Sequence, residues 1–334
     1  MTDMPTTLFM DVEPADRPLV SKRFPEAIFA DASLRDQELI HACDGADVIS
    51  TFITTPFPRS VIQNVPNLKL LCTRSVGCDH IDLAACSERG ILVTNVPDYG
   101  SHVIAEHVFA LLLSTLRHVP EGSARVHGGV FDYHGLRGMA LRGKTIGILG
   151  TGRIGRKVTQ IAHGFGMKIL CTDRCRTLEL EDLLHARYVP FAELLRESDI
   201  ITLHIPALPE TEHLIDAKAF AEMKRGVILV NTARGSLIDS RALLEALKNG
   251  TVAYALLDVL EHEQNFEENK ELVTHPNVVT TPHIAFYADD SMRAMFLDCF
   301  DSIEQWREGK TPEHLVKPPT IVCDLPGIRQ PQRI

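Results

Sequence analysis

The sequence has neither the long apolar runs of membrane proteins nor the excess of basic residues found in proteins whose whole surface binds nucleic acid. Its longest apolar stretch, residues 103–116, contains Glu106 and His107 and is shorter than the ~20 residues of a membrane-spanning helix. Basic residues are also scarce, because 34 Lys and Arg stand against 44 Asp and Glu, a formal net charge of −10. Such a balance argues against a surface that meets nucleic acid or anionic lipid. We therefore expect no membrane segment and no nucleic-acid or membrane partner.

Two further absences concern cysteine and histidine. The eight cysteines form no CxxC pair, and several lie inside apolar runs. None of the 15 histidines has metal-ligand spacing alongside acids or cysteines. Residues 1–17 lack the charged segment and apolar core of a secretory signal. We expect a cytoplasmic protein with reduced thiols and no bound metal.

What the sequence contains is the length and composition of an ordinary globular protein. Its 334 residues, 45% hydrophobic and 23% charged, suffice for two domains at roughly 150 residues each. Short β-rich apolar runs alternate with helical patterns, which is typical of βαβ units on a parallel sheet. In the first part we expect strands at 7–12, 47–53, 68–74 and 91–96, and helices at 57–64 and 83–89.

The alternation pauses at a turn-rich stretch, residues 95–100, before a long helical pattern from Ser101 to about Val119. It then resumes, with strands expected at 145–149, 167–172, 199–205, 227–232, 252–259 and 277–280, and helices at 153–163, 191–197, 216–223, 240–248 and 289–308. These patterns predict an α/β protein with two doubly wound parallel-sheet domains, residues 1–99 with 290–334 and residues 100–289.

A glycine-rich turn predicts a dinucleotide site. The sequence Gly150-Thr-Gly152-Arg153-Ile154-Gly155 follows an apolar run and opens a helical pattern. Gly150 permits a tight turn, Gly152 lets the backbone approach a pyrophosphate, and Gly155 allows helix and strand to pack closely. The start of the helix supplies unpaired N–H groups for the phosphates, with Arg153 and Ile154 beside them.

An acidic residue ends the next expected strand. Asp173 lies 18 residues after Gly155, where a carboxylate accepts hydrogen bonds from the ribose hydroxyls of NAD and repels a 2′-phosphate. NAD is therefore the expected cofactor. Arg174 and Arg176 leave the use of NADP open, because a guanidinium at either position could hold a phosphate.

Three polar residues follow the last three expected strands, where open parallel sheets bind their ligands. They are Arg234, Glu263 and His283. Hydride transfer between a 2-keto acid and a 2-hydroxy acid needs a cation for the carboxylate, a histidine that gives or takes a proton, and an acid that orients this histidine. Each residue also has a plainer interpretation, Arg234 as a solvated loop residue, Glu263 as part of an acidic surface, and His283 as a buried structural histidine.

Five motifs in order resemble those of the D-isomer-specific 2-hydroxyacid dehydrogenase family, over about residues 45–300. They are Gly150–Gly155 with Asp173, Leu203-His204-Ile-Pro206 with Thr211, Asn231-Thr232-Ala-Arg234-Gly-Ser236, Asp258-Val-Leu-Glu-His-Glu263, and Thr281-Pro282-His283. The resemblance implies that residues 1–99 and 290–334 form a flavodoxin-like substrate domain. It also implies that residues 100–289 form a Rossmann NAD-binding domain, with an active-site cleft between the two.

The resemblance assigns a role to each polar residue. Arg234 would bind the substrate carboxylate and polarise its carbonyl, His283 would be the acid/base, and Glu263 would be the carboxylate partner of His283. The residues implied on the cofactor side are His204, Pro206, Thr232 and Asp258, the last at the nicotinamide amide.

The first domain adds substrate signals. Arg74-Ser-Val76-Gly77 resembles the family's substrate loop, in which the N–H groups of Val76 and Gly77 would meet the carboxylate. Asn95-Val-Pro97-Asp-Tyr99 and Pro282-His-Ile-Ala-Phe286-Tyr287 resemble the D-lactate dehydrogenase branch, with Tyr99, Phe286 and Tyr287 near the substrate. Gly100 and Ala288 depart from that branch, where Ser and Thr are common.

We predict an NAD-dependent dehydrogenase that reduces pyruvate or a similar small 2-keto acid to the D-2-hydroxy acid. Tyr99, Phe286 and Tyr287, together with Phe57, would form an apolar pocket that fits a methyl or ethyl side chain and disfavours a phenyl ring or a second carboxylate. An NAD-sensing corepressor or other binding protein of the same family is the alternative, because such members can keep the same polar residues. An L-specific lactate or malate dehydrogenase is disfavoured, since its glycine motif lies near the N-terminus.

The long helical pattern that begins at Ser101 bears on assembly. The resemblance implies that this helix packs against a helix of a second subunit, so a homodimer is expected. His102 and His107 on the same helix are expected to be structural.

Overall fold

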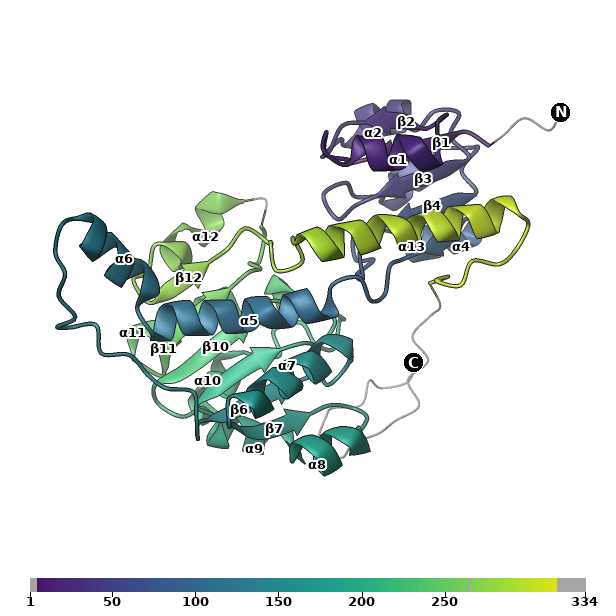
Figure 1. Ribbon diagram of the computed structural model, residues 1–334. Helices are drawn as coiled ribbons and strands as arrows, with labels where there is room; N and C mark the ends of the chain where they lie inside the picture. Colours follow the sequence, from purple (N-terminus) through teal and green to yellow (C-terminus); the bar gives the residue numbers. More distant parts are fainter. Residues whose placement is uncertain (1–4, 264, 317–334) are drawn as a thin grey trace. The chain divides into compact units, whose positions relative to one another are not determined.

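The computed structural model describes residues 5–263 and 265–316, which divide into two compact units (Figure 1). The first unit comprises residues 5–100 and 288–316, and the second comprises the described residues from 101 to 287. Each unit contains one parallel sheet with helices packed against it. Two parallel-sheet α/β domains confirm the predicted fold class. Residues 317–334, which the sequence assigned to the first domain, lie outside the described residues.

The first unit is built on a five-stranded sheet in the order β2-β1-β3-β4-β5, which is the flavodoxin-like order. Its strands are β1 (Thr7–Met10), β2 (Ile28–Ala30), β3 (Val48–Thr51), β4 (Leu70–Thr73) and β5 (Leu92–Thr94). Its helices are α1 (Arg17–Arg23), α2 (Asp36–Ala42), α3 (Arg59–Ile62), α4 (Leu83–Glu88) and α13 (Asp289–Arg307). Strands β1, β3 and β4 are buried at every residue, as in parallel sheets covered on both faces.

One aromatic residue of the first unit corrects a prediction. Phe57 is fully buried in an apolar cluster with residues of β1, β3 and β4. Its ring therefore belongs to the core of this unit, and the prediction that Phe57 lines a substrate pocket is wrong. The loop position suggested exposure, but the isolated pairing of Phe57 with Ile81 holds the residue against the core.

The second unit is built on a seven-stranded sheet in the order β12-β11-β10-β9-β6-β7-β8. Its strands are β6 (Thr145–Leu149), β7 (Lys168–Thr172), β8 (Arg187–Tyr188), β9 (Ile200–Leu203), β10 (Val227–Asn231), β11 (Val252–Leu257) and β12 (Val278–Thr280). Its helices are α5 (Ser101–Leu116), α6 (Val119–His127), α7 (Arg153–Gly164), α8 (Leu178–Leu184), α9 (Phe191–Glu197), α10 (Ala217–Glu222), α11 (Ser240–Lys248), α12 (Phe266–Val273) and the short 3-10 helix η1 (Gly235–Leu237).

The strand order of the second unit locates its ligand site. The chain passes from β6 to β7 on one side and later returns to pair β9 with the other side of β6. In doubly wound sheets ligands bind beyond the carboxyl ends of the strands at such a reversal. Gly150 directly follows β6 and His204 directly follows β9, so the glycine turn lies at this point.

The thiols differ in one respect from the expectation. Cys175, which lies in the loop after β7 and outside any apolar run, is disulfide-bonded. The expectation of reduced thiols is therefore wrong for this residue. The buried cysteines with free thiols are Cys43, Cys72, Cys86, Cys171 and Cys299. Within the described chain, no helix combines the length and the apolar character needed to cross a membrane.

Candidate active site

In the turn between β6 and α7, two of the three glycines leave no room for a side chain. Gly150 has a φ of +95°, and a Cβ there would lie 2.5 Å from the carbonyl oxygen of His204. A Cβ on Gly155 would lie 2.0 Å from the carbonyl oxygen of Gly150. By contrast, a Cβ on Gly152 would meet nothing within 4 Å. The N-terminus of α7 therefore opens onto free space, which fits a pyrophosphate held by backbone N–H groups.

Asp173 is fixed at the mouth of this turn. Its Oδ2 accepts hydrogen bonds from Thr151 N at 2.5 Å and Thr151 Oγ1 at 2.9 Å. The hydroxyl of Tyr188 donates to the same Thr151 Oγ1 at 2.9 Å. The carboxylate thus stands beside the glycine turn at the end of β7, where the ribose of a dinucleotide would lie.

The two arginines after Asp173 both face carboxylates. Arg174 Nη2 lies 2.9 Å from Glu210 Oε1. Arg176 forms an ion pair with Glu181 and lies over the ring of Tyr188. Both guanidinium groups are therefore engaged within the protein, a restraint that the sequence alone did not indicate.

His204 follows β9 and borders the glycine turn. Its Nε2 lies 2.9 Å from Thr202 Oγ1, and its backbone N–H donates to the carbonyl of Leu149 at 2.7 Å. Burial lowers the pKa of His204 to about 3, so its ring is neutral at physiological pH. Pro206 lies next in the same loop, where its carbonyl accepts a hydrogen bond from Thr211 Oγ1 at 2.8 Å.

Arg234 lies in the loop after β10. Asn231 braces this loop, because its Nδ2 donates to the carbonyl of Arg234 at 2.8 Å and its Oδ1 accepts from Ala233 N at 3.0 Å. Thr232 Oγ1 is buried and has no hydrogen-bond partner among the described residues. An orphaned hydroxyl at the carboxyl end of a central strand fits a position that a bound cofactor completes.

Glu263 and His283 are brought together by the loops after β11 and β12. His283 Nδ1 lies 3.1 Å from Glu263 Oε2. His283 has a φ of +53°, a conformation that turns its loop sharply. The pairing that the sequence suggested for these two residues is thus present in the structure as a direct contact.

Asp258 holds the loop that carries His283. Its buried carboxylate accepts hydrogen bonds from Ile284 N and Ala285 N, both at 2.9 Å, and from Thr281 Oγ1 at 2.5 Å. Burial raises the pKa of Asp258, but these bonds and one from His107 outweigh it and keep the pKa below its ordinary value. The internal use of this carboxylate was not evident from the sequence, which assigned Asp258 to the nicotinamide amide.

Two aromatic rings follow His283 in the same segment. The ring centroids of His283 and Phe286 are 6.3 Å apart, and those of Phe286 and Tyr287 are 5.9 Å apart, both edge to face. The other predicted substrate residues, Tyr99 and the Val76–Gly77 pair, lie in the first unit after β5 and β4. The fully buried Arg74 anchors the start of that loop by donating to the carbonyls of Met10 and Asp11 at 2.6 and 2.8 Å.

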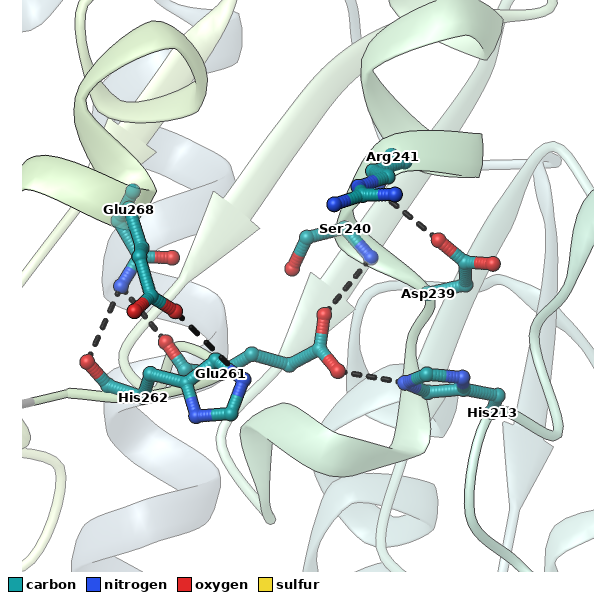
Figure 2. Close-up of a pocket in the computed structure, with 8 residues that line it drawn as sticks. His213, Asp239, Ser240, Arg241, Glu261, His262 and Glu268 are labelled. Carbon is teal, nitrogen blue, oxygen red and sulfur yellow. Dashed lines mark hydrogen bonds and ion pairs between the residues drawn. The ribbon is translucent and has the colours of Figure 1, made fainter. Parts of the chain in front are cut away.

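A polar pocket of about 420 Å³ lies on the loop that carries Glu263 (Figure 2). Its lining residues are His213, Asp239, Ser240, Arg241, Glu261, His262, Glu268 and Asn269. His213 Nε2 lies 2.5 Å from Glu261 Oε1, and Ser240 N donates to Glu261 Oε2 at 2.9 Å. The sequence did not indicate this cluster, because nothing in the spacing of these residues along the chain brings them together. Across the described residues, no group of three or more His, Cys, Asp and Glu is arranged to hold a metal ion.

Comparison with known proteins identifies the family. Residues 109–285 match the model of the D-isomer specific 2-hydroxyacid dehydrogenase, NAD binding domain. The glyoxylate reductase of Pyrococcus furiosus is 38% identical over 301 residues, which cover 88% of this chain and 89% of that protein.

Solved structures agree. The D-lactate dehydrogenase from Aquifex aeolicus, complexed with NAD and lactic acid, has a TM-score of 0.85 and 32% identity over 94% of this chain and all of the other. The apo-structure of D-lactate dehydrogenase from Escherichia coli has a TM-score of 0.84 and 30% identity, and it covers 93% of this chain and 100% of that one. The chain therefore belongs to the D-isomer-specific 2-hydroxyacid dehydrogenase family, and its second unit contains the NAD-binding domain of that family.

Proposed function

We propose that the protein reduces pyruvate or a similarly small 2-keto acid with NADH to the D-2-hydroxy acid. The observation that supports this best is the 3.1 Å contact between His283 Nδ1 and Glu263 Oε2. A carboxylate at Nδ1 orients the ring and presents Nε2 to a substrate oxygen. In reduction, the protonated ring of His283 gives its Nε2 proton to the carbonyl oxygen of the substrate.

Arg234 is the proposed partner of the substrate carboxylate. Its planar guanidinium can donate two parallel hydrogen bonds to a carboxylate, which a lysine cannot do. The braced loop after β10 restricts where this side chain can reach. We assign the other substrate-binding roles to Phe286 and Tyr287 in the second unit and to Val76, Gly77 and Tyr99 in the first.

The residues around the glycine turn are the proposed cofactor contacts. NAD, when bound, supplies or accepts the hydride. Gly152, Arg153 and Ile154 at the start of α7 would hold the pyrophosphate, and Asp173 would accept hydrogen bonds from the ribose hydroxyls. We assign His204, Pro206, Thr232 and Asp258 to the remaining cofactor side. The carboxylate of Asp173 and the engaged guanidinium groups of Arg174 and Arg176 together favour NAD over NADP.

The aromatic pair after His283 supports a small apolar side chain on the substrate. A methyl or ethyl group can contact the rings of Phe286 and Tyr287, whereas a carboxylate facing them would lose its hydrogen bonds to water at a cost of roughly 1–3 kcal/mol or more. Pyruvate and 2-ketobutyrate are therefore the proposed substrates.

Glyoxylate is a second candidate, because sequence relatives at 38% identity are named glyoxylate reductases. Glyoxylate is pyruvate without the methyl group. Loss of that methyl contact is worth about 0.8 kcal/mol, a few-fold in kcat/KM. The two candidates are thus separated by rate, because glycolate, the product from glyoxylate, has no stereocentre that could be compared.

A substrate panel tests the proposal. We expect kcat/KM with NADH to be highest for pyruvate or 2-ketobutyrate, lower for glyoxylate and hydroxypyruvate, and lowest for phenylpyruvate and oxaloacetate. In the reverse direction D-lactate, and not L-lactate, should be oxidised. A tenfold preference for phenylpyruvate or oxaloacetate over pyruvate would contradict the aromatic pocket. NAD binding without turnover of any 2-keto acid would favour the corepressor alternative.

We further propose a cytoplasmic homodimer in which α5 and the segment after it meet a second copy of the chain. Helix α6 contains no buried residue, and the apolar side chains of Val119, Val126 and Val130 in it and just after it are exposed. Phe131 is 94% exposed and Tyr133 is 79% exposed. Exposed apolar side chains clustered in one segment mark an interaction surface. Light scattering of the wild type and of a Phe131→Asp, Tyr133→Asp variant tests this, with a dimer and a monomer as the expected masses.

A further inference from the structure

We propose that His213 and Glu261 act as a positioning pair that clasps the loops of the acid/base site and thereby holds Glu263 against His283. This inference rests on the proposed roles of Glu263 and His283. Neither His213 nor Glu261 touches the reacting atoms in this proposal, and their effect is exerted through the loop that carries Glu263.

The first step concerns the carboxylate of Glu261, which lies two residues before Glu263 in the loop after β11. One oxygen lies 2.5 Å from His213 Nε2, and the other accepts from Ser240 N at the start of α11 (Figure 2). The Glu261 side chain is only 16% exposed. A largely buried carboxylate with both oxygens engaged is costly to displace, so it fixes the loop that carries it.

The second step concerns the backbone of the same loop. Asn269, a buried residue of α12, donates from Nδ2 to the carbonyl of Glu261 at 2.6 Å. On the other side, a Cβ on Gly235 would lie 2.0 Å from the carbonyl carbon and oxygen of Leu260. The loop of Arg234 therefore touches the loop of Glu261 at backbone distance. Any shift of Glu261 is transmitted to both loops, because packed backbones cannot pass one another.

The third step concerns His213, whose loop is bound to the segment after Arg234. His213 N donates to the carbonyl of Ser236 at 2.8 Å, and Ile215 N donates to that of Leu237 at 3.0 Å. His213 thus reaches Glu261 from a backbone already paired with the residues that follow Arg234. The pair closes a ring of contacts that runs through the loops after β9, β10 and β11.

The charges around the pair favour its ionised form near neutral pH. Burial raises the pKa of Glu261, but hydrogen bonds from Ser240 and His213 outweigh it and hold this pKa below its ordinary value. The hydrogen bond with Glu261 in turn raises the pKa of His213. The other charged or titratable groups that face the pair are Glu212, Asp239, Arg241, His262 and Glu268. The negative charges of Asp239 and Glu212 raise the pKa of His213 further.

The test compares Glu261→Gln with Glu263→Gln. In reduction His283 must be protonated, so kcat/KM falls on the alkaline side, and loss of the Glu263 carboxylate should move this limb to lower pH. If Glu261 positions Glu263, Glu261→Gln should lower kcat about tenfold and move the same limb in the same direction. The affinity for NADH, measured by fluorescence, should stay unchanged. The double variant should behave like Glu263→Gln alone.

A matched control and a milder variant complete the design. Glu268→Gln removes another carboxylate of the same pocket, 3.8 Å from His262, and should leave the limb in place. His213→Gln acts on the partner whose side chain is 43% exposed and should reproduce the shift if Glu261→Gln does not fold.

The outcomes separate this inference from the proposed function. A lower melting temperature with an unmoved limb in both Glu261→Gln and His213→Gln, while Glu263→Gln moves it, would overturn the positioning role. Additive shifts in the double variant would overturn it as well. An unmoved limb in Glu263→Gln would instead reject the pairing of Glu263 with His283, on which the proposed function depends.

Discussion

The two halves of the second sheet hold their proposed ligands in different ways. At the reversal between β6 and β9 the shape of the backbone forms the site. Gly150 and Gly155 allow backbone segments to lie so close together that any Cβ would clash. At the ends of β10, β11 and β12, side chains form the site, through Asp258, Glu261 and Asn231. A site made of glycines can be recognised in a sequence, whereas a site braced by distant side chains becomes visible only in the fold.

The largest effect is expected from a change at the ends of β10 to β12, where side chains hold the proposed substrate. Arg234→Gln should lower kcat/KM for the 2-keto acid by about 10³-fold, because a bidentate charge-assisted contact to the carboxylate is lost. NADH affinity should remain close to that of the wild type. The control is Arg196→Gln. Arg196 is an exposed residue of α9 that pairs with Glu222 of α10, so its loss should leave kcat/KM unchanged. An equal loss of NADH affinity would make Arg234 a structural residue.

The converse change is made in the glycine turn at the reversal between β6 and β9, where the backbone holds the proposed cofactor. Gly155→Ala should weaken NADH binding by about 10- to 100-fold, since relieving a Cβ placed 2.0 Å from the carbonyl oxygen of Gly150 costs about 1–3 kcal/mol of distortion. Gly164→Ala in the same helix meets nothing within 4 Å and should leave the dissociation constant unchanged. Fluorescence titration with NADH measures both. Equal affinities of the two variants would show that the tight turn does not serve the cofactor.

A smaller effect sharpens the picture of the braced loop. Asp258→Asn should lower the free energy of unfolding by about 2 kcal/mol, because an amide replaces a buried charged acceptor. The folded pKa of Asp258 lies below its ordinary value of 3.8, so its contribution is present above that pH and is lost as the pH falls through the folded pKa. The difference between wild type and variant should therefore shrink below pH 3.8 in denaturant titrations. Asp182→Asn, at an exposed position of α8, should show no such difference at any pH.

The smallest effect lies at the rim of the cofactor half. Glu210→Gln should raise kcat/KM with NADPH relative to NADH by about threefold, because Arg174 loses its partner and becomes available to a 2′-phosphate. Asp173→Ala should reduce the preference for NADH over NADPH further. The double variant should reduce this preference more than either single change. Glu181→Gln removes the partner of Arg176 in the same way, so the cofactor ratios of the two variants compare the two guanidinium groups. An unchanged cofactor ratio in Glu210→Gln would show that Arg174 does not reach that phosphate.

Much of the second sheet could be predicted, because its buried strands are apolar runs bounded by turns. The strand 145–149 and the helices 191–197 and 240–248 have the expected bounds. The elements that the patterns did not indicate are α1, α2, β2, α6, α8, β8, η1 and α12. Helix α6 buries no residue and so shows no apolar face, and β2 is a three-residue edge strand. Helix α12 begins within an acidic run, and its buried residues are Asn269 and Leu272, which are too few to give an apolar face.

The contact between the expected acid and histidine could be predicted from their positions after neighbouring strands together with the order of the motifs. Glu263 and His283 follow adjacent strands, and the structure brings them into contact as expected. Phe57 was assigned wrongly because a loop position in the sequence says nothing of packing against the core. His213, Glu261 and Ser240 are far apart along the chain, and only the crossing of three loops makes them neighbours.

The strand order also has a consequence for how the chain folds. β10, β11 and β12 are consecutive both in the chain and in the sheet, so the framework of the acid/base residues needs only short-range crossovers. β6 must pair with β9 across a longer stretch of chain, because Thr145 at the start of β6 and Asp199 just before β9 are 54 residues apart. Closing the longer loop costs more chain entropy and is slower. Pulsed hydrogen exchange should thus find the amides that pair β10 with β11 and β11 with β12 protected before those that pair β6 with β9, so the framework of the acid/base residues would form before the strand reversal that holds the glycine turn.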